Sequence, residues 1–246
     1  MHQFFVKPEQ IGEKDIIIEG TDVNHIRNVL RMKEGEELTI CTGQDDKFYR
    51  CEVAESSPEF VRAKIMWIEE SGAELPSKIY LFQGLPKSDK MELIIQKAVE
   101  LGAWEIIPVA TKRAVVKLDA KKAENKQKRW QAISESAAKQ CKRQYIPEVA
   151  LPMSFEKALE KAETLDINLV PYELAKDMQE TRQRIGQIKP GQSVGIFIGP
   201  EGGFAEEEIQ AAAEKGFVPI TLGRRILRTE TAGLAALSML VFALEP

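Results

Sequence analysis

Apolar and polar residues alternate in short runs over the first 70 positions of the chain. Runs with a period of two are typical of half-buried β-strands, and turn-forming residues at 43–46 and 56–58 separate them. The runs cover residues 15–20, 36–43, 47–56 and 60–70. We therefore predict a small β-barrel or β-rich module in this part of the chain.

One segment of the module, residues 22–31, has its apolar positions at helical spacing instead. The side expected to be buried is formed by Val23, Ile26, Val29 and Leu30. The side expected to face outward is formed by Arg27, Asn28 and Arg31. The pattern predicts one helix here, and we interpret His25 within it as structural.

After a linker-like segment at 71–76 (SGAELP), strand-like runs alternate with helical ones. Strands are expected within 78–85, 104–111, 167–174, 193–203 and 217–223. Helices are expected at 89–102, around Trp130, at 176–185, at 206–216 and at 232–244. This alternation is typical of a parallel sheet with helices on both faces. We predict a β-barrel domain at 1–72 and an α/β domain at 73–246.

Two of these helices carry local signals of their own. Ser88 or Asp89 is a suitable N-cap for the first, and Gly102 follows its last apolar residue. In the helix around Trp130 the apolar side chains share one face, so cations cover the other. That apolar face consists of Trp130, Ile133, Ala137 and Cys141.

The composition excludes several classes of protein. The longest apolar run, 232–244, is too short to cross a bilayer, and no segment has the pattern of a signal peptide. Cys41, Cys51 and Cys141 lack the spacing of a zinc site or a disulfide framework. Since His2 and His25 are the only histidines, a His-based metal site or a Ser-His-Asp triad is poorly supplied. We expect a cytoplasmic protein with neither metal nor membrane anchor.

Charge is distributed unevenly along the chain. The formal net charge is -4, but residues 112–143 hold eleven lysines and arginines against three acids, a net charge of +8. Such a segment predicts a positive face directed at a polyanion, and RNA is the candidate. A plain solvated surface remains the alternative.

A tight loop, Gly-Pro-Glu-Gly-Gly at 199–203, follows one buried strand. Ligands of open α/β sheets bind beyond the carboxyl ends of the strands, where this loop lies. Neither phosphate-binding glycine pattern is present, and the next helix begins with Glu206, Glu207 and Glu208, which would repel a phosphate. The loop suits a neutral or cationic ligand, unless it is only a structural corner.

The second such loop is LGRRILRTETAG at 222–233. It follows the strand ending at Leu222, turns at Gly223 and leads into the last helix, for which Thr229 or Thr231 is a suitable cap. We expect Ile226 and Leu227 to lie under a ligand while the arginines face outward. Both loops would then converge on one pocket; a solvated turn is the alternative.

These two loops resemble the paired motifs of the bacterial small-subunit ribosomal RNA uridine N3-methyltransferases, members of the SPOUT class of knotted methyltransferases. The resemblance rests on IGPEGGF (198–204) together with LGRRILRTETA (222–232), and extends over nearly the whole chain. NHIRNVLRMKEGEEL (24–38) resembles the PUA-like RNA-binding module of the family. The chain departs from the pattern at AKQCKR (138–143), where Lys139 and Lys142 replace an acid and a glycine.

The resemblance implies a knotted α/β domain, S-adenosylmethionine as cofactor, and a homodimer acting on small-subunit ribosomal RNA, as naked RNA or in the assembled subunit. The implied cofactor residues are Pro171, Leu174, Ile198, Gly199, Pro200, Glu201, Gly202, Gly203, Leu222, Gly223, Ile226, Leu227, Arg228, Thr229 and Ala232. The expected RNA contacts are Arg27, Arg31, Lys87, Arg113, Arg129, Lys142, Arg143, Arg224 and Arg225.

The chemistry of uridine N3 assigns further roles. Its proton must leave, and the charge that develops on O2 and O4 must be stabilised, which suits a guanidinium. We predict that Arg228 does this, with Glu201, Glu230 or solvent taking the proton. The alternative is that Arg228 only pairs with Glu230 or Glu201. A ribose 2'-O-methyltransferase and a non-catalytic ribosome-assembly protein are the rival functions; a dehydrogenase would need a G-x-G-x-x-G motif that is absent.

Overall fold

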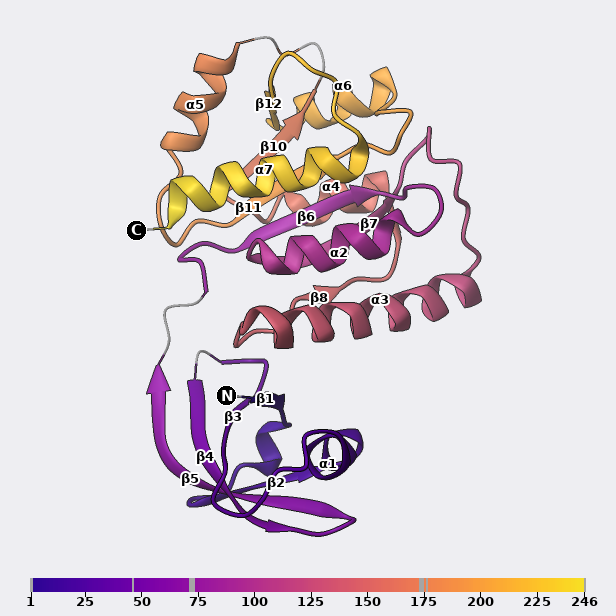
Figure 1. Ribbon diagram of the computed structural model, residues 1–246. Coiled ribbons are helices and arrows are strands. Elements are labelled where there is room, and N and C mark those ends of the chain that lie inside the picture. Colours follow the sequence, from indigo (N-terminus) through magenta and orange to yellow (C-terminus); the bar gives the residue numbers. More distant parts are fainter. Residues whose placement is uncertain (1, 46, 71–73, 173–174, 176, 246) are drawn as a thin grey trace. The chain divides into compact units, whose positions relative to one another are not determined.

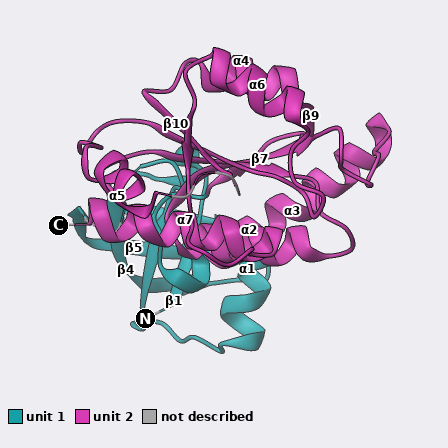
Figure 2. Cartoon of the chain, turned by 90° about the horizontal axis from the view of Figure 1, so that it is seen from above, with its two compact units in different colours: residues 1–74, 138–146 teal, residues 75–137, 147–246 magenta. Residues whose placement is uncertain are grey.

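The computed structural model describes residues 2–45, 47–70, 74–172, 175 and 177–245 (Figure 1). The chain forms two compact units, which Figure 2 distinguishes by colour. Unit 1 comprises residues 1–74 and 138–146, and unit 2 comprises residues 75–137 and 147–246. The boundary predicted between residues 72 and 73 lies outside the described residues.

Unit 1 contains a curled five-stranded sheet with the order β1-β3-β4-β5-β2. The sheet is antiparallel except where β1 runs parallel to β3. In β2 the side chains of Ile16 and Ile18 are buried while those of Asp15, Ile17 and Glu19 are not, as expected for a period of two. The strands are β1 (His2–Phe5), β2 (Asp15–Glu19), β3 (Glu37–Cys41), β4 (Lys47–Ser56) and β5 (Phe60–Glu70).

The helix predicted in unit 1 exists, but half of it is a π-helix. Helix α1 (Thr21–Asn24) continues as η2 (His25–Val29), in which the Leu30 N–H donates to the His25 carbonyl at 2.9 Å. A π-turn holds an extra residue, which rotates the following side chains out of the α-helical phase. Val29 is therefore 62% exposed, so its predicted burial is wrong, and Met32 is buried instead.

Unit 2 is an α/β domain, as predicted. Its seven-stranded sheet has the order β12-β10-β11-β6-β7-β8, with β9 paired to β7, and all of these pairings are parallel. The strands are β6 (Ile79–Gly84), β7 (Ala103–Ala110), β8 (Glu148–Val149), β9 (Met153–Ser154), β10 (Ile167–Pro171), β11 (Val194–Ile198) and β12 (Val218–Ile220).

Helices cover both faces of this sheet. Helices α2, α5 and α7 lie on one face and α4 and α6 on the other, as Figures 1 and 2 show. The core on the α4 and α6 side includes Phe82 and Phe197, whose stacked rings have centroids 4.2 Å apart. The helices are α2 (Lys90–Glu100), α3 (Ala120–Cys141), α4 (Phe155–Ala162), α5 (Met178–Gly186), α6 (Glu206–Glu214) and α7 (Thr229–Leu244).

The basic helix α3 buries more than its predicted apolar stripe. Trp130 and Ala137 are buried, whereas Ile133 and Cys141 are only half-buried. The polar side chain of Ser134 also faces inward, and its hydroxyl donates to the Pro147 carbonyl at 2.6 Å. Across the described residues, no helix has the length and apolar character needed to cross a membrane.

Candidate active site

Four strands of unit 2 end at the same edge of the sheet. Because β6, β10, β11 and β12 are parallel, the loops that follow them leave from one side. These loops include the two glycine- and arginine-rich sequences at 199–203 and 222–228 (Figure 1). Pro171 ends β10 beside them, while Leu174, which the resemblance implies as a cofactor residue, lies outside the described residues.

The loop 199–203 is a tight turn lying across the end of β6. The Gly203 N–H donates to the Pro200 carbonyl at 2.9 Å, and the φ of Gly203 is +66°, in the left-handed region that favours glycine. A Cβ on Gly84 would lie 2.7 Å from the Pro200 nitrogen. The close approach of these two segments therefore requires glycine at position 84.

Neighbouring residues brace the loop and the start of α6. The Arg113 guanidinium donates to the Gly202 carbonyl at 3.2 Å. The buried Glu208 carboxylate accepts the N–H groups of Ala205 and Lys112, each at 2.8 Å. Since Glu208 already binds the N–H of Ala205 and adds negative charge here, the α6 N-terminus does not suit phosphate.

A buried hydroxyl ties α7 to the loop. Thr229 is 5% exposed, and its Oγ1 donates to the Gly199 carbonyl at 2.7 Å while accepting from Gln83 Nε2 at 2.8 Å. The N-cap of α7 is Arg228, whose carbonyl accepts the Thr231 and Ala232 N–H groups. The expectation that Thr229 or Thr231 caps this helix is therefore wrong, because the Thr229 hydroxyl bonds across to another segment.

An ion cluster that the sequence analysis missed lies in the same region. Lys90 Nζ is 2.9 Å from Glu201 Oε1 and 3.3 Å from Glu230 Oε2, although the second contact lacks the direction of a hydrogen bond. The Lys87 backbone N–H also donates to Glu201, at 3.1 Å. No local pattern identifies Lys90, because its partners lie more than a hundred residues away in the sequence.

These contacts set the protonation of Glu201. Burial acts to raise the pKa of its carboxyl group, but the hydrogen bonds from Lys90 and from backbone N–H groups outweigh it and hold the pKa below its usual value. The pKa of Lys90 is raised, chiefly by the hydrogen bond to Glu201. Both groups are therefore charged at neutral pH, and Glu201 is a weak base.

The three arginines of the second loop remain unpaired. Arg224, Arg225 and Arg228 are exposed, and their side chains form no ion pair or hydrogen bond within the described part of the chain. Pairing of Arg228 with Glu201 or Glu230, the alternative considered from the sequence, is absent because Lys90 binds both. Leu227 is half-buried, but Ile226 is 89% exposed, so the expectation that it lies under a ligand has no support in this geometry.

The remaining expected RNA contacts differ in accessibility. Those with exposed side chains are Arg31, Lys87, Arg113, Arg129 and Lys142, whereas Arg27 is half-buried. Arg143 differs from all of these, since it is 5% exposed and its Nη2 lies 2.5 Å from Glu74 Oε2. The Arg143 guanidinium pairs with Glu74 within unit 1, and its burial argues against direct contact with RNA.

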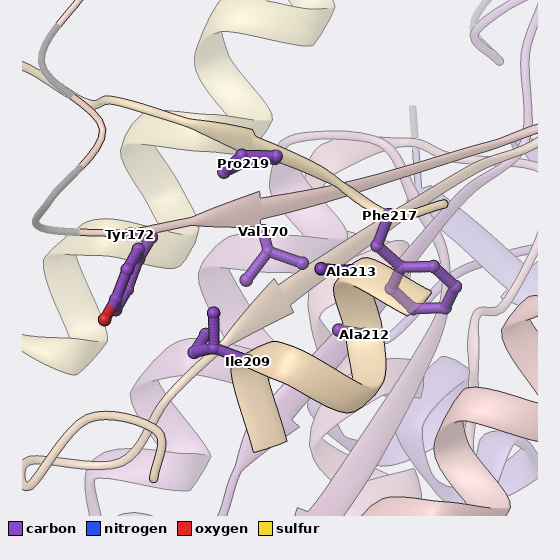
Figure 3. A pocket seen from close by; sticks show the side chains of 7 residues that line it. All are labelled: Val170, Tyr172, Ile209, Ala212, Ala213, Phe217 and Pro219. Carbon is purple, nitrogen blue, oxygen red and sulfur yellow. The ribbon is translucent and has the colours of Figure 1, made fainter. Parts of the chain in front are cut away.

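A small apolar cavity lies beside β10, β12 and α6, apart from the polar groups described above (Figure 3). Its volume is about 40 Å³, enough for a water molecule but not for a nucleoside. Its lining consists of Val170, Tyr172, Ile209, Ala212, Ala213, Phe217 and Pro219. This cavity is therefore too small to be the candidate site, which we place at the edge formed by the loops. Within the described ranges, no group of three or more His, Cys, Asp or Glu residues could hold a metal ion.

Comparison with known families identifies both halves of the chain. Residues 73–241 match the RNA methyltransferase domain, and residues 18–66 match the RNA methyltransferase PUA domain. Ribosomal RNA small subunit methyltransferase E of Bacillus subtilis is 40% identical over 251 residues, covering 100% of this chain and 98% of the relative.

Solved structures give the same result. The enzyme of that name from Neisseria gonorrhoeae, bound to S-adenosyl methionine, has a TM-score of 0.83 at 33% identity, over 97% of this chain and 95% of the other. A Legionella pneumophila methyltransferase in complex with the same cofactor has a TM-score of 0.85 at 34% identity, over 98% and 97%. The chain therefore belongs to the ribosomal RNA small subunit methyltransferase E family of RNA methyltransferases.

Proposed function

We propose that this protein transfers a methyl group from S-adenosylmethionine to N3 of a uridine in small-subunit ribosomal RNA. The observation that supports this best is the meeting of the glycine loop 199–203 with the start of α7, where the Arg228 guanidinium has no partner among the described residues. The loop offers backbone groups to a ligand, and the arginine offers positive charge to the reacting base.

The residues at this edge fit a cationic cofactor. Two carboxylates, Glu201 and Glu230, share the single ammonium of Lys90, so the cluster has a net negative charge. Together with the acidic start of α6 this suits a sulfonium better than a phosphate. We propose that the loops 198–203 and 222–229, with Pro171, Leu174 and Ala232, hold the cofactor. When bound, it supplies an electrophilic methyl group.

Arg228 has the chemistry needed at the base. N3 becomes a nucleophile when its proton leaves, and the resulting negative charge is shared by O2 and O4. A planar guanidinium that is always charged can hydrogen-bond this oxyanion in a fixed geometry. Arg228 is not engaged elsewhere within the described residues, so its donors are available for this role.

The proton on N3 needs an acceptor near the reacting base. Glu201 is a poor choice, because its lowered pKa and its bonds to Lys87 and Lys90 engage the carboxylate. Among the described residues, Glu230 has only the ion pair with Lys90. We propose that the proton passes to Glu230 or directly to solvent.

RNA would be held by cations on both units. The accessible candidates are Arg27, Arg31, Lys87, Arg113, Arg129, Lys142, Arg224 and Arg225. Phosphate contacts of this kind orient an RNA without reading its sequence, and the target base would be flipped out to reach the loops. This proposal includes a cytoplasmic location, where ribosomal RNA is assembled into subunits.

Two further features complete the proposal. The trefoil knot implied by the resemblance would thread the loops that hold the cofactor. A homodimer would cover the outward face of α7, where Phe242 is 90% exposed. An apolar side chain on the outer face of a helix is a common mark of an interface.

The direct test is incubation with labelled S-adenosylmethionine and small ribosomal subunits that lack the modification, followed by nucleoside analysis. We expect label on N3-methyluridine. Label on a ribose would exclude the base chemistry, and the absence of label on either subunits or naked ribosomal RNA would exclude the proposed substrate. A parallel reaction with Arg228→Ala should yield almost no product.

A further inference from the structure

One buried hydrogen-bond chain links three segments of the candidate active site, and it begins at Gln83. This residue is 0% exposed, one position before the end of β6, and pairs in register with Ile198 of β11. Its Nε2 donates to Thr229 Oγ1 at 2.8 Å and to the Gly84 carbonyl at 3.0 Å. Because a carbonyl only accepts hydrogen bonds, the contact with Gly84 fixes which end of the amide faces Thr229.

The direction of the chain is therefore determined. The Thr229 hydroxyl accepts from Gln83 and donates to the Gly199 carbonyl at 2.7 Å. Thr229 directly follows Arg228, and Gly199 is the first residue of the loop that contains Glu201. The chain thus fixes the backbone of Arg228 relative to the glycine loop.

Gln83 is an unfavourable choice for packing alone. Its Oε1 is buried without a hydrogen-bond partner in the described structure, on the side where Gly233 of α7 approaches. An unpaired buried acceptor destabilises a fold, whereas methionine would fill similar space with no such penalty. The amide donor is therefore the feature that distinguishes glutamine at this position.

A second link joins the same two segments from the solvent side. Lys90, in the first turn of α2, contacts Glu201 of the loop and Glu230 of α7. Both links originate in the short stretch from the end of β6 to the start of α2. The buried chain joins Gly199 to Thr229, and Glu201 lies two residues beyond the first of these while Glu230 directly follows the second.

We propose that Gln83 and Lys90 are positioning residues that hold Arg228 in register with the loop 199–203. This rests on the proposed function, in which the loop binds the cofactor and Arg228 faces the base. Neither residue needs to touch a substrate. A displacement of Arg228 by about 1 Å would lower the rate by up to about 100-fold.

The first test is Gln83→Met. We expect kcat to fall at least about tenfold, while KM for RNA and the midpoint of unfolding stay near their wild-type values. Thr229→Val removes the next member of the chain, so the double variant should lose no more activity than the worse single variant. Losses that multiply in the double variant would refute a shared chain.

The matched control is Asn168→Ala. Asn168 is another buried amide in the same sheet; its Nδ2 donates to the Ala162 carbonyl, and its Oδ1 has no hydrogen-bond partner among the described residues. We expect this variant to lose stability but to keep the kcat of the folded protein. If Gln83→Met behaves in the same way, Gln83 is an ordinary core residue and the proposal is wrong.

Lys90→Met tests the outer link, with Lys97→Met as its control. Lys97 lies on the same helix and pairs with Glu100 at 2.8 Å, away from both loops. We expect a several-fold loss of kcat for Lys90→Met and none for Lys97→Met. Equal effects of the two substitutions would contradict a role for Lys90 in positioning.

Amide hydrogen exchange separates this proposal from the proposed function. In Gln83→Met, the segments 199–203 and 228–232 should exchange at least several-fold faster than in wild type, and in Asn168→Ala they should not. This holds even if the wild-type protein methylates no RNA. Unchanged exchange in both segments would overturn the positioning role whatever the activity shows.

Discussion

Arg228 forms no ion pair with the described residues, because Lys90 pairs with the nearby carboxylates of Glu201 and Glu230. Lys90 lies 2.9 Å from Glu201 and 3.3 Å from Glu230, so the arginine that follows Leu227 has no acidic partner within the described structure. A side chain without internal contacts contributes little to folding. Its chemistry is then available to a ligand, and the two roles can be separated by mutation.

Arg228→Ala should abolish catalysis without affecting stability. Removing one charged donor from a developing oxyanion lowers kcat by about 100- to 1,000-fold. The free energy of unfolding should change by less than about 0.5 kcal/mol, because the side chain is exposed and has no partner in the part of the chain that the structure describes. Methylation of subunits and urea unfolding measure the two quantities.

Arg182→Ala is the control for this substitution, since Arg182 is an exposed arginine of α5. It should change neither quantity. Normal turnover by Arg228→Ala would remove the arginine from the mechanism, and a large loss of stability would show that the side chain supports the fold.

The cysteines differ in their expected reactivity. Burial raises the pKa of both Cys41 and Cys51 to about 12, and for Cys41 the charge of Asp45 adds to this effect. Only the thiolate reacts, so at pH 8 both thiols should be inert in the folded protein. Half-buried Cys141 should react first with a disulfide reagent. Unfolding should make Cys41 and Cys51 reactive as well. Cys141→Ser should remove the fast phase of the thiol reaction in the folded protein. Fast reaction of a second thiol would contradict the burial of Cys41 and Cys51.

At the scale of elements, local patterns identified most strands and helices, while pairings between distant segments were missed. The period of two in the apolar positions predicted β2 to β5, and the alternation of strand-like and helical runs predicted the parallel sheet. Strand β1 has only four residues and is stabilised by β3, more than thirty residues away. The Lys90 cluster and the burial of Arg143 against Glu74 likewise depend on tertiary contacts, which spacing along the chain does not encode.

The π-turn in η2 shows how one extra residue misleads a helical pattern. Because of the π-turn, we expect alanine substitutions of two apolar residues, which would share a face in an ideal α-helix, to have different effects on stability. Ile26→Ala should lower the free energy of unfolding by about 2–5 kcal/mol, because Ile26 is fully buried. Val29→Ala should change it by less than about 0.5 kcal/mol, since Val29 is 62% exposed. Equal losses in chemical denaturation would mean that the segment is an ordinary α-helix.

The start of α6 depends on one glutamate of its acidic run. Glu208 is buried and accepts from Ala205 and Lys112, so Glu208→Ala leaves two N–H groups without their partner. We expect a loss of about 1–3 kcal/mol in the free energy of unfolding. Exposed Glu206 begins the same helix, and Glu206→Ala should cost less than about 1 kcal/mol. A comparable loss from both would indicate that only the helix dipole matters.

Over the whole molecule, the basic segment is less positive than its composition indicates. Within the described residues, ion pairs with acids are formed by five of the eleven cations between 112 and 143: Lys112, Lys122, Arg129, Lys139 and Arg143. Most of these pairs are exposed and would contribute little to stability. Phosphates can compete for the exposed members, but the buried Arg143 remains with Glu74. Arg143 therefore supports unit 1, and the accessible cations of this segment remain for RNA.

Helix α7 has apolar residues on all sides, although it lies on the outside of unit 2. Its inner face buries Gly233, Ala236, Leu237, Leu240 and Leu244 against the domain. On its outer side Phe242 is 90% exposed, and Leu93 of α2, the helix packed beside it, is 45% exposed. An apolar surface of this kind favours association with a second copy.

We therefore expect the wild-type protein to sediment at twice its 27.6 kDa chain mass and Phe242→Glu to sediment at the mass of one chain. A charge buried without a partner in a dimer interface is strongly unfavourable, whereas on the surface of a monomer it is tolerated. Val115→Glu is the control, because Val115 is 68% exposed but lies in the segment before α3. It should leave the mass unchanged. If the wild-type protein sediments as one chain, or if Phe242→Glu still sediments as a dimer, α7 is not the dimer interface. If the monomeric variant still methylates RNA at the wild-type rate, each chain holds a complete site.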